Sequence, residues 1–315
     1  MIVVLDPAPL AIHGPADLLT AIPYILGYHP QNRVVVFITN EGRLTCGLSV
    51  DRQTPDAVIV AQSSSAASHA NARTAVVVGY GPLSDRHQIA RVADKINVAV
   101  TVQACLLVDG GRYYCLVDGC LCTPEHGAVL ETASSVIAAE MTLLGRPVLA
   151  SREHFDALLE PDTDAQARTA AAMASLPKPP TEPVTIVRSS LEHASAGERL
   201  SDEQAAYLAV ALSNNEGRST AWEATTGEIW QQDLWLDLAR RVPEHCVAVP
   251  ANLLAWSAWR RSEPALAWAA LSKAIHAMPD NAMSHLIGIL LASGINPATL
   301  PWPLPDGTDL EDLLR

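Results

Sequence analysis

The sequence predicts an α/β N-terminal domain, a mixed sheet with helical cover, followed by an all-helical C-terminal part. In the first half, short apolar runs alternate with helical segments and hairpins, the pattern of a sheet covered by helices. After the proline-rich stretch 177–183, helical patterns dominate, and all seven tryptophans follow that stretch. We therefore divide the chain into an α/β domain (1–150), a helical and proline-rich connector (151–200), a helical domain (201–300) and a proline-rich, acidic and loosely held tail (301–315).

The elements of the first half follow from local patterns. The continuous apolar run 34–38 is typical of a strand buried on both faces, and the turn at 40–42 predicts a hairpin. Thr54 and Ser84 are expected to cap the helices that follow them. The predicted strands are 34–38, 44–50, 74–78, 98–108 and 112–117, and the predicted helices are 17–26, 54–71, 85–96 and 128–144.

The second half is predicted to contain helices at 202–213, 228–241, 250–261, 265–278 and 282–292. Within it, one helix pair has small and apolar residues at the offsets of a tetratricopeptide hairpin. These residues are Leu254, Ala255, Ala267, Leu271, Ala274 and Pro279. Because stable arrays need about three such repeats, we interpret the pair as one hairpin in a larger helical layer, with a peptide-binding role or ordinary helix packing as the alternatives.

Charge and hydropathy exclude several classes of protein. The formal net charge is −13, with 21 basic against 34 acidic residues, which argues against a nucleic-acid partner. No stretch reaches the roughly 18 apolar residues of a membrane span, and the N-terminus lacks the basic region of a secretory signal. We expect a cytoplasmic protein, whose six cysteines stay reduced.

Several segments carry a resemblance to a known family. They are 14–19, 23–30, 33–38 and the hairpin turn 109–114, with further similarity at 151–153, 254–274 and Pro279. Together they resemble the actinobacterial domain-of-unknown-function 4192 family over about residues 12–300. The resemblance implies a bacterial cytoplasmic protein and supplies no reaction, cofactor or partner. In that family two adjacent cysteines often precede a proline, whereas Leu121 separates Cys120 from Cys122 here.

The cysteines form the best candidate constellation for chemistry. Cys115, Cys120, Cys122 and His126 lie within twelve residues, and thiolates with imidazole are good zinc ligands. The spacing is not the usual Cys-x2-Cys knuckle, and no second pair completes a zinc ribbon. The sequence therefore leaves two interpretations, a zinc site or a hairpin end packed with small apolar thiols.

A redox pair is a further alternative in the same hairpin. If 109–111 is a three-residue loop, Cys105 and Cys115 face each other across the two strands. Two facing thiols are a geometry in which a disulfide can form.

A second group of polar residues surrounds the first helix-to-strand junction. Asp17, Tyr24, His29 and Arg33 are candidates for ligand binding there, and Asp17 with His29 for a general acid–base pair. Asp109 and Arg112, at the hairpin, are further ligand-binding candidates. The alternative is structural, because a carboxylate near a helix start also favours the helix dipole.

Nucleotide-binding and hydrolase motifs are missing. Gly79-Tyr80-Gly81 follows a strand, but the third glycine of a dinucleotide fingerprint is replaced by Ser84. The chain has no phosphate-binding Gly-Lys-Ser/Thr loop and no Gly-x-Ser-x-Gly elbow. The leading hypothesis is a non-enzymatic interaction or regulatory module with a protein partner and no cofactor. The alternative is a small-ligand-binding protein or enzyme with a site near Asp17, His29 and the cysteine hairpin.

Overall fold

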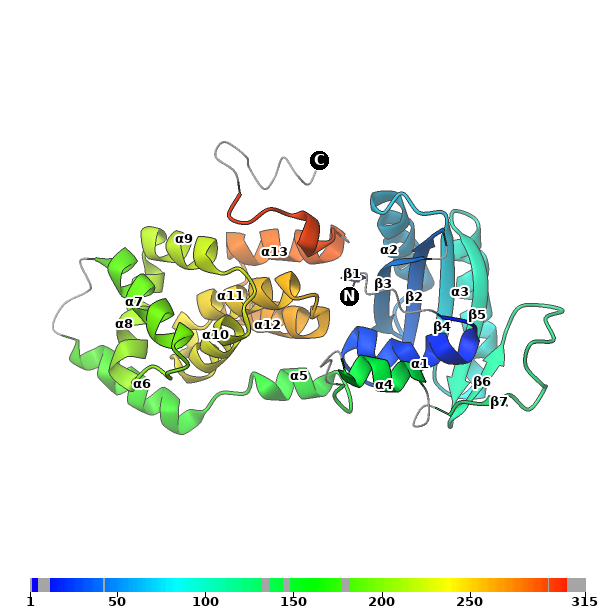
Figure 1. Cartoon of the computed structure of the whole chain (residues 1–315), viewed down its shortest axis with the longest axis horizontal. Helices are drawn as coiled ribbons and strands as arrows, with labels where there is room; N and C mark the ends of the chain where they lie inside the picture. The colour runs from blue at the N-terminus through cyan, green and yellow to red at the C-terminus, as the bar shows by residue number, and fades with distance from the viewer. Residues whose placement is uncertain are drawn as a thin grey trace. The chain divides into compact units, whose positions relative to one another are not determined.

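The computed structural model describes residues 2–4, 12–41, 43–131, 136–143, 148–176, 182–293 and 295–304. The chain divides into two compact units, Met1–His154 with Leu291–Asn296, and Phe155–Leu290 with Pro297–Arg315. The first unit holds the sheet and the second is helical (Figure 1). The predicted fold class, an α/β part followed by a helical part, is confirmed.

The sheet is mixed. Its described strands are β1 (Ile2–Val4), β2 (Arg33–Asn40), β3 (Arg43–Asp51), β4 (Thr74–Tyr80), β5 (Thr101–Asp109), β6 (Arg112–Cys115) and β7 (Ala128–Val129). They lie in the order β1-β3-β2-β4-β5-β6-β7. β4 and β5 are parallel, and every other neighbouring pair is antiparallel. A parallel pair needs a crossover connection, and a helix supplies it here.

Helices cover both sides of this sheet. They are α1 (Pro15–Leu26), α2 (Asp56–His69), the short 3-10 helix η1 (Leu83–Asp85), α3 (Arg86–Asn97) and α4 (Val136–Leu143). Ile59 of α2 and Ile89 of α3 belong to one core cluster with Val36, Val77 and Leu107 of the central strands. Alternate residues point to the other face, where Ser49 lies 2.9 Å from the Tyr28 hydroxyl just after α1. α1 and α4 pack side by side (Figure 1).

Two predicted caps and one strand boundary are wrong. α2 begins after Pro55 without a side-chain cap, so Thr54 does not serve as one. Ser84 lies inside η1, because the chain tightens into a 3-10 turn before α3. The strand predicted to begin at residue 98 begins at Thr101, since α3 continues to Asn97, whose Oδ1 accepts a hydrogen bond from the Val102 N–H at 2.8 Å.

The helix predicted for 128–144 is also wrong in its first part. Ala128 and Val129 form β7 and pair with Tyr113 and Arg112 of β6. The cause is Gly127, whose φ of 76° turns the chain back toward β6. α4 therefore begins only at Val136 among the described residues, and the predicted helix end lies outside them.

The helical unit contains most of the remaining elements. In chain order these are α5 (Glu153–Leu158), α6 (Thr163–Ser175), α7 (Pro183–Ser195), α8 (Asp202–Ser213), α9 (Asn215–Ala224), α10 (Ile229–Arg241), η2 (Glu244–Cys246), α11 (Ala248–Arg260), α12 (Pro264–Ala277), α13 (Ala282–Ser293) and η3 (Pro297–Thr299). α11 and α12 form the hairpin expected from the sequence, and their small residues Ala255, Ala267 and Ala274 are fully buried. The tetratricopeptide likeness of this hairpin stays a prediction.

The beginning of the predicted loose tail contacts the helical unit through Trp302. The Trp302 ring centroid lies 4.4 Å from that of Trp256 and 5.6 Å from that of Trp222. Within residues 301–304 the half-buried Trp302 ring makes this contact, while Pro301 and Pro303 are exposed. Residues 305–315 lie outside the described part of the chain. No helix among the described residues is long and apolar enough to cross a membrane.

Candidate thiol site

The hairpin that carries the cysteines has a two-residue turn. Asp109 pairs with Arg112, and Gly110 and Gly111 between them both have positive φ, 55° and 78°. This is the geometry that two-residue hairpins favour and that glycine adopts without strain. The premise of a three-residue loop is therefore wrong.

The short turn sets the positions of the first two cysteines. Cys115 lies opposite Leu106, not opposite Cys105. Opposed residues share a face of the sheet and their sequence neighbours point to the other face, so the two thiols are on different faces. Cys105 is buried in the core cluster. The proposed redox pair is not formed.

Beyond Cys115 the chain leaves the sheet and folds back on itself. The Cys120 N–H donates to the Val117 carbonyl at 3.1 Å, which closes a turn. The Cys115 N–H donates to the Thr123 hydroxyl at 3.0 Å, which ties the second part of the loop to the end of β6. These bonds place Cys120 and Cys122 beside Cys115.

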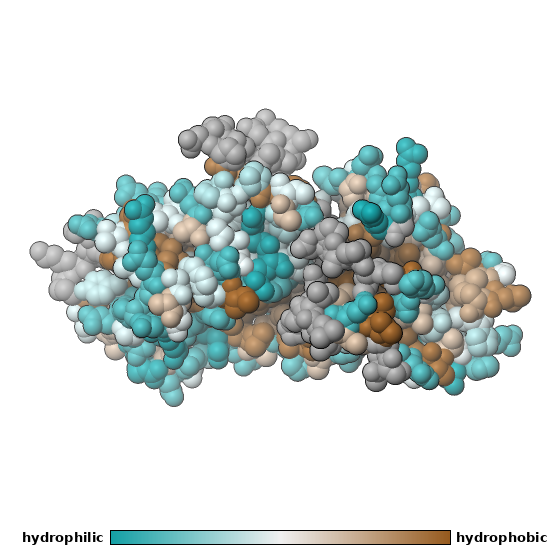
Figure 2. Space-filling model, in the orientation of Figure 1, coloured by the Kyte–Doolittle hydropathy of each residue, from teal (hydrophilic) through white to brown (hydrophobic). Residues whose placement is uncertain are grey.

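The Arg112 side chain holds the return of the loop. Its Nη1 donates to the Gly127 carbonyl at 3.0 Å and to the His126 carbonyl at 3.4 Å. Arg112, a ligand-binding candidate from the sequence, therefore fixes loop geometry. The rest of the loop is largely exposed, and Val117 and Leu121 keep 42% and 95% of their surface in solvent. Figure 2 shows hydrophobic surface at the end of the sheet unit where this loop projects.

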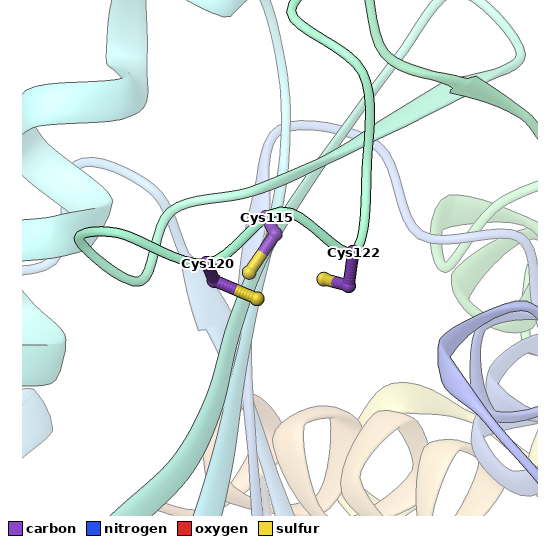
Figure 3. Close-up of side chains that lie close together, drawn as sticks. All are labelled: Cys115, Cys120 and Cys122. Carbon is purple, nitrogen blue, oxygen red and sulfur yellow. The ribbon is translucent and has the colours of Figure 1, made fainter.

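Three thiols converge in the loop. The Sγ atoms of Cys115, Cys120 and Cys122 all lie within 4.8 Å of one another, and they point toward a common centre (Figure 3). We call these three side chains the thiol triad. Cys115 is half-buried at the end of β6, and the other two are exposed. Three of the four ligands expected from the sequence come together, whereas the His126 side chain is not part of the cluster among the described residues.

The pKa values of Cys120 and Cys122 are shifted in opposite directions. Hydrogen bonds from the thiols of Cys122 and Cys115 lower the pKa of Cys120. The same bond to Cys120 raises the pKa of Cys122 to about 12, because Cys122 acts as the donor. Cys120 is thus the thiol that ionises first, and a thiolate is the form that binds metal or attacks an electrophile. Burial, by contrast, raises the pKa of Cys105 to about 12.

The spacing of the triad is close to that of a metal site. A zinc–sulfur bond of about 2.3 Å places the sulfurs of a tetrahedral site about 3.8 Å apart. Sγ atoms within 4.8 Å of one another need to close by only about 1 Å to reach that arrangement. Thiolates also suit Cu(I), and three of them leave a further coordination position open on zinc.

The acid–base pair expected at the first junction is not assembled. Asp17 accepts a hydrogen bond from the His13 N–H at 3.0 Å, and the His29 N–H donates to the Leu149 carbonyl at 3.0 Å. The two side chains lie at opposite ends of α1, whose 12 residues span roughly 18 Å. No hydrogen bond or ion pair joins them in the described part of the chain. Tyr24 is half-buried on α1.

The structure gives the remaining candidates different neighbours. A hydrogen bond from Ser151 lowers the pKa of Glu153, and the nearby positive charge of Arg33 lowers it further. This neighbourhood was not predicted, because about 120 residues separate the two side chains in the chain. Asp109 accepts a hydrogen bond from the Leu83 N–H at 2.9 Å. The Leu83 N–H, at the start of the 3-10 helix that follows β4, is therefore already bonded to Asp109 and not available to a bound anion.

Comparisons with known proteins give a family and nothing further. The model of a family described as Domain of unknown function (DUF4192) matches residues 15–298. No curated protein and no solved structure matches the chain.

Proposed function

Because this chain belongs to the DUF4192 family, whose description assigns no reaction, we propose its function from its geometry: it binds a thiophilic metal ion, zinc in the first place, at the thiol triad. The observation that carries the proposal is the convergence of three Sγ atoms within 4.8 Å. Soft thiolates select zinc or Cu(I) over magnesium and calcium, which prefer oxygen ligands.

The position of the triad supports a regulatory role over a purely structural one. Structural zinc sites are closed by four protein ligands, whereas three ligands leave a position for an incoming group. Cys120 and Cys122 are exposed, so an ion can enter and leave without unfolding of the sheet. A reducing cytoplasm, the expected compartment, would keep the thiols available.

The surroundings of the triad also support a protein partner. Val117 and Leu121, in the same loop, are exposed apolar residues. A polypeptide that covers them would lie next to the open coordination position. The function is then that of an interaction module whose contact depends on the metal.

The test is a zinc titration of the reduced protein against a chromophoric chelator. The wild type takes up one ion, and Cys120→Ser and Cys122→Ser each lower the affinity by more than the roughly 10–100-fold that loss of an outer-shell group costs. Cys246→Ser is the matched control, because Cys246 is a half-buried thiol of the helical unit. It should bind zinc like the wild type.

Two results would overturn the proposal. A reduced wild type that does not compete with the chelator has no zinc site. An equal loss of affinity in Cys246→Ser and in the triad variants would mean that the thiols bind without a common site. In either case the triad would be a packed hairpin end.

A further inference from the structure

A tryptophan cluster in the helical unit holds a segment that belongs to no α-helix. The cluster consists of Trp222 on α9 with Trp256 and Trp259 on α11, joined by ring contacts of 5.6 Å and 5.1 Å between centroids. Residues 297–304, which we call the 297–304 segment, place the Trp302 ring against two of these rings. Trp256 is fully buried beneath it.

Both backbone and side chains of the segment contact the helices. Arg260 Nη1 donates to the Pro297 carbonyl at 2.8 Å and to the Leu300 carbonyl at 2.6 Å. The Trp302 indole N–H donates to the Trp222 carbonyl at 3.2 Å. Backbone carbonyls are common to every polypeptide, so the specific part of the contact is the Trp302 ring and the buried Leu300 side chain. Pro301 and Pro303 flank that ring and restrict the backbone on both sides of it.

The fit between segment and cluster is incomplete. Two buried donors beside the segment, Trp222 Nε1 and Arg260 Nε, have no hydrogen-bond acceptor among the described residues. Burial, with no carboxylate beside it among the described residues, lowers the pKa of the Arg260 guanidinium. A buried donor without an acceptor is unfavourable, so a ligand that offers two more acceptors would bind this place better than the chain's own segment does.

We propose that the tryptophan cluster and Arg260 form a binding site for a proline-flanked tryptophan segment of a partner protein, which the 297–304 segment occupies within the same chain. The regular structure of the 297–304 segment is the short helix η3, so this segment can detach while α9 and α11 stay intact. An internal ligand competes at an effective concentration of roughly millimolar, which a tighter external segment overcomes. This proposal is independent of the thiol triad.

The test is binding of a fluorescent peptide with the sequence of residues 297–304 to the full chain. Trp302→Ala empties the ring position and should bind the peptide. The wild type should bind it at least about tenfold more weakly, because the internal segment competes. Trp230→Ala, which removes a half-buried tryptophan outside the cluster, should behave like the wild type.

A control peptide and a folding check distinguish a displaceable ligand from a segment that only stabilises the helices. The same peptide with alanine in place of tryptophan should not bind Trp302→Ala. The proposal is overturned if that variant, folded by circular dichroism, binds neither peptide or binds both equally.

If Trp302→Ala does not fold, hydrogen exchange of the wild-type chain tests whether the segment detaches. The Leu300 N–H, which donates to the Pro297 carbonyl at 3.3 Å, should exchange faster than the amides of α11. Exchange of both at the same rate would mean that the segment leaves only when the helices unfold, and would contradict the proposal.

Discussion

The two candidate sites of this protein are built in opposite ways. The thiol triad lies on a loop of the sheet unit, and all its groups come from eight consecutive residues. The tryptophan cluster lies on α9 and α11, with rings from positions 222 to 259, and it holds the Trp302 ring, which is 80 residues from Trp222 in the chain. A loop site is held by a few hydrogen bonds and can open to exchange an ion, whereas a buried aromatic site is part of the core. Substitutions in the thiol triad should therefore change metal binding with little change in the free energy of unfolding. Substitutions in the tryptophan cluster should lower the free energy of unfolding as well as binding.

The largest expected effect is on the helical core. Trp256→Ala removes a fully buried ring, together with its indole hydrogen bond to the Thr225 carbonyl at 2.9 Å. We expect a loss of about 3–5 kcal/mol in the free energy of unfolding, measured by chemical denaturation. Cys120→Ser should change it by less than about 0.5 kcal/mol, because its side chain is exposed. Equal losses for the two variants would break the contrast.

A buried polar group provides a second large effect. The Gln231 side-chain oxygen accepts hydrogen bonds from the backbone N–H groups of Thr226, Gly227 and Glu228. Gln231→Leu leaves these donors without that acceptor, and we expect a loss of about 2–3 kcal/mol in the free energy of unfolding. Gln232→Leu, at a half-buried position, is the control and should cost less than about 1 kcal/mol. A cost below that of the control would show that water satisfies the turn.

The loop should respond in binding and not in stability. Thr123→Val removes the acceptor of the Cys115 N–H and loosens the triad. We expect zinc affinity to fall by roughly 10–100-fold, as for other groups that orient ligands, while the free energy of unfolding changes by less than about 1 kcal/mol. The chelator competition and a denaturation curve on the same sample measure both quantities. Unchanged affinity would mean that the ion itself organises the loop.

The smallest and most local effect is a difference in thiol reactivity. The lowered pKa of Cys120 gives it more thiolate at neutral pH than Cys122, whose pKa is raised to about 12. Iodoacetamide should therefore modify Cys120 first, and its rate should fall as the pH falls, because protonation removes the thiolate. Peptide mass spectrometry identifies the site. Cys46, buried with a pKa raised to about 11, should remain unmodified in the folded protein. Preferential modification of Cys122 would contradict the proton arrangement described for the triad.

The five helices predicted between residues 202 and 292 match α8, α10, α11, α12 and α13 to within about two residues at each end, whereas the errors in caps and element starts lie in the sheet unit. Apolar periods identify the buried strands, and three of the four candidate ligands lie together because they are close in the chain. Thr123 could have been found as a hydroxyl beside the last thiol, whereas the exclusion of His126 depends on how the loop returns to β6. The place of Trp302 was not predictable from its surroundings, since prolines on both sides indicate a loop and its partners are distant in the chain.

The most direct test of the metal proposal is X-ray absorption at the zinc edge of the reduced, zinc-loaded protein. The triad predicts three sulfur ligands at about 2.3 Å and one nitrogen or oxygen ligand. A shell of nitrogen and oxygen ligands without sulfur would place the ion elsewhere and contradict the account.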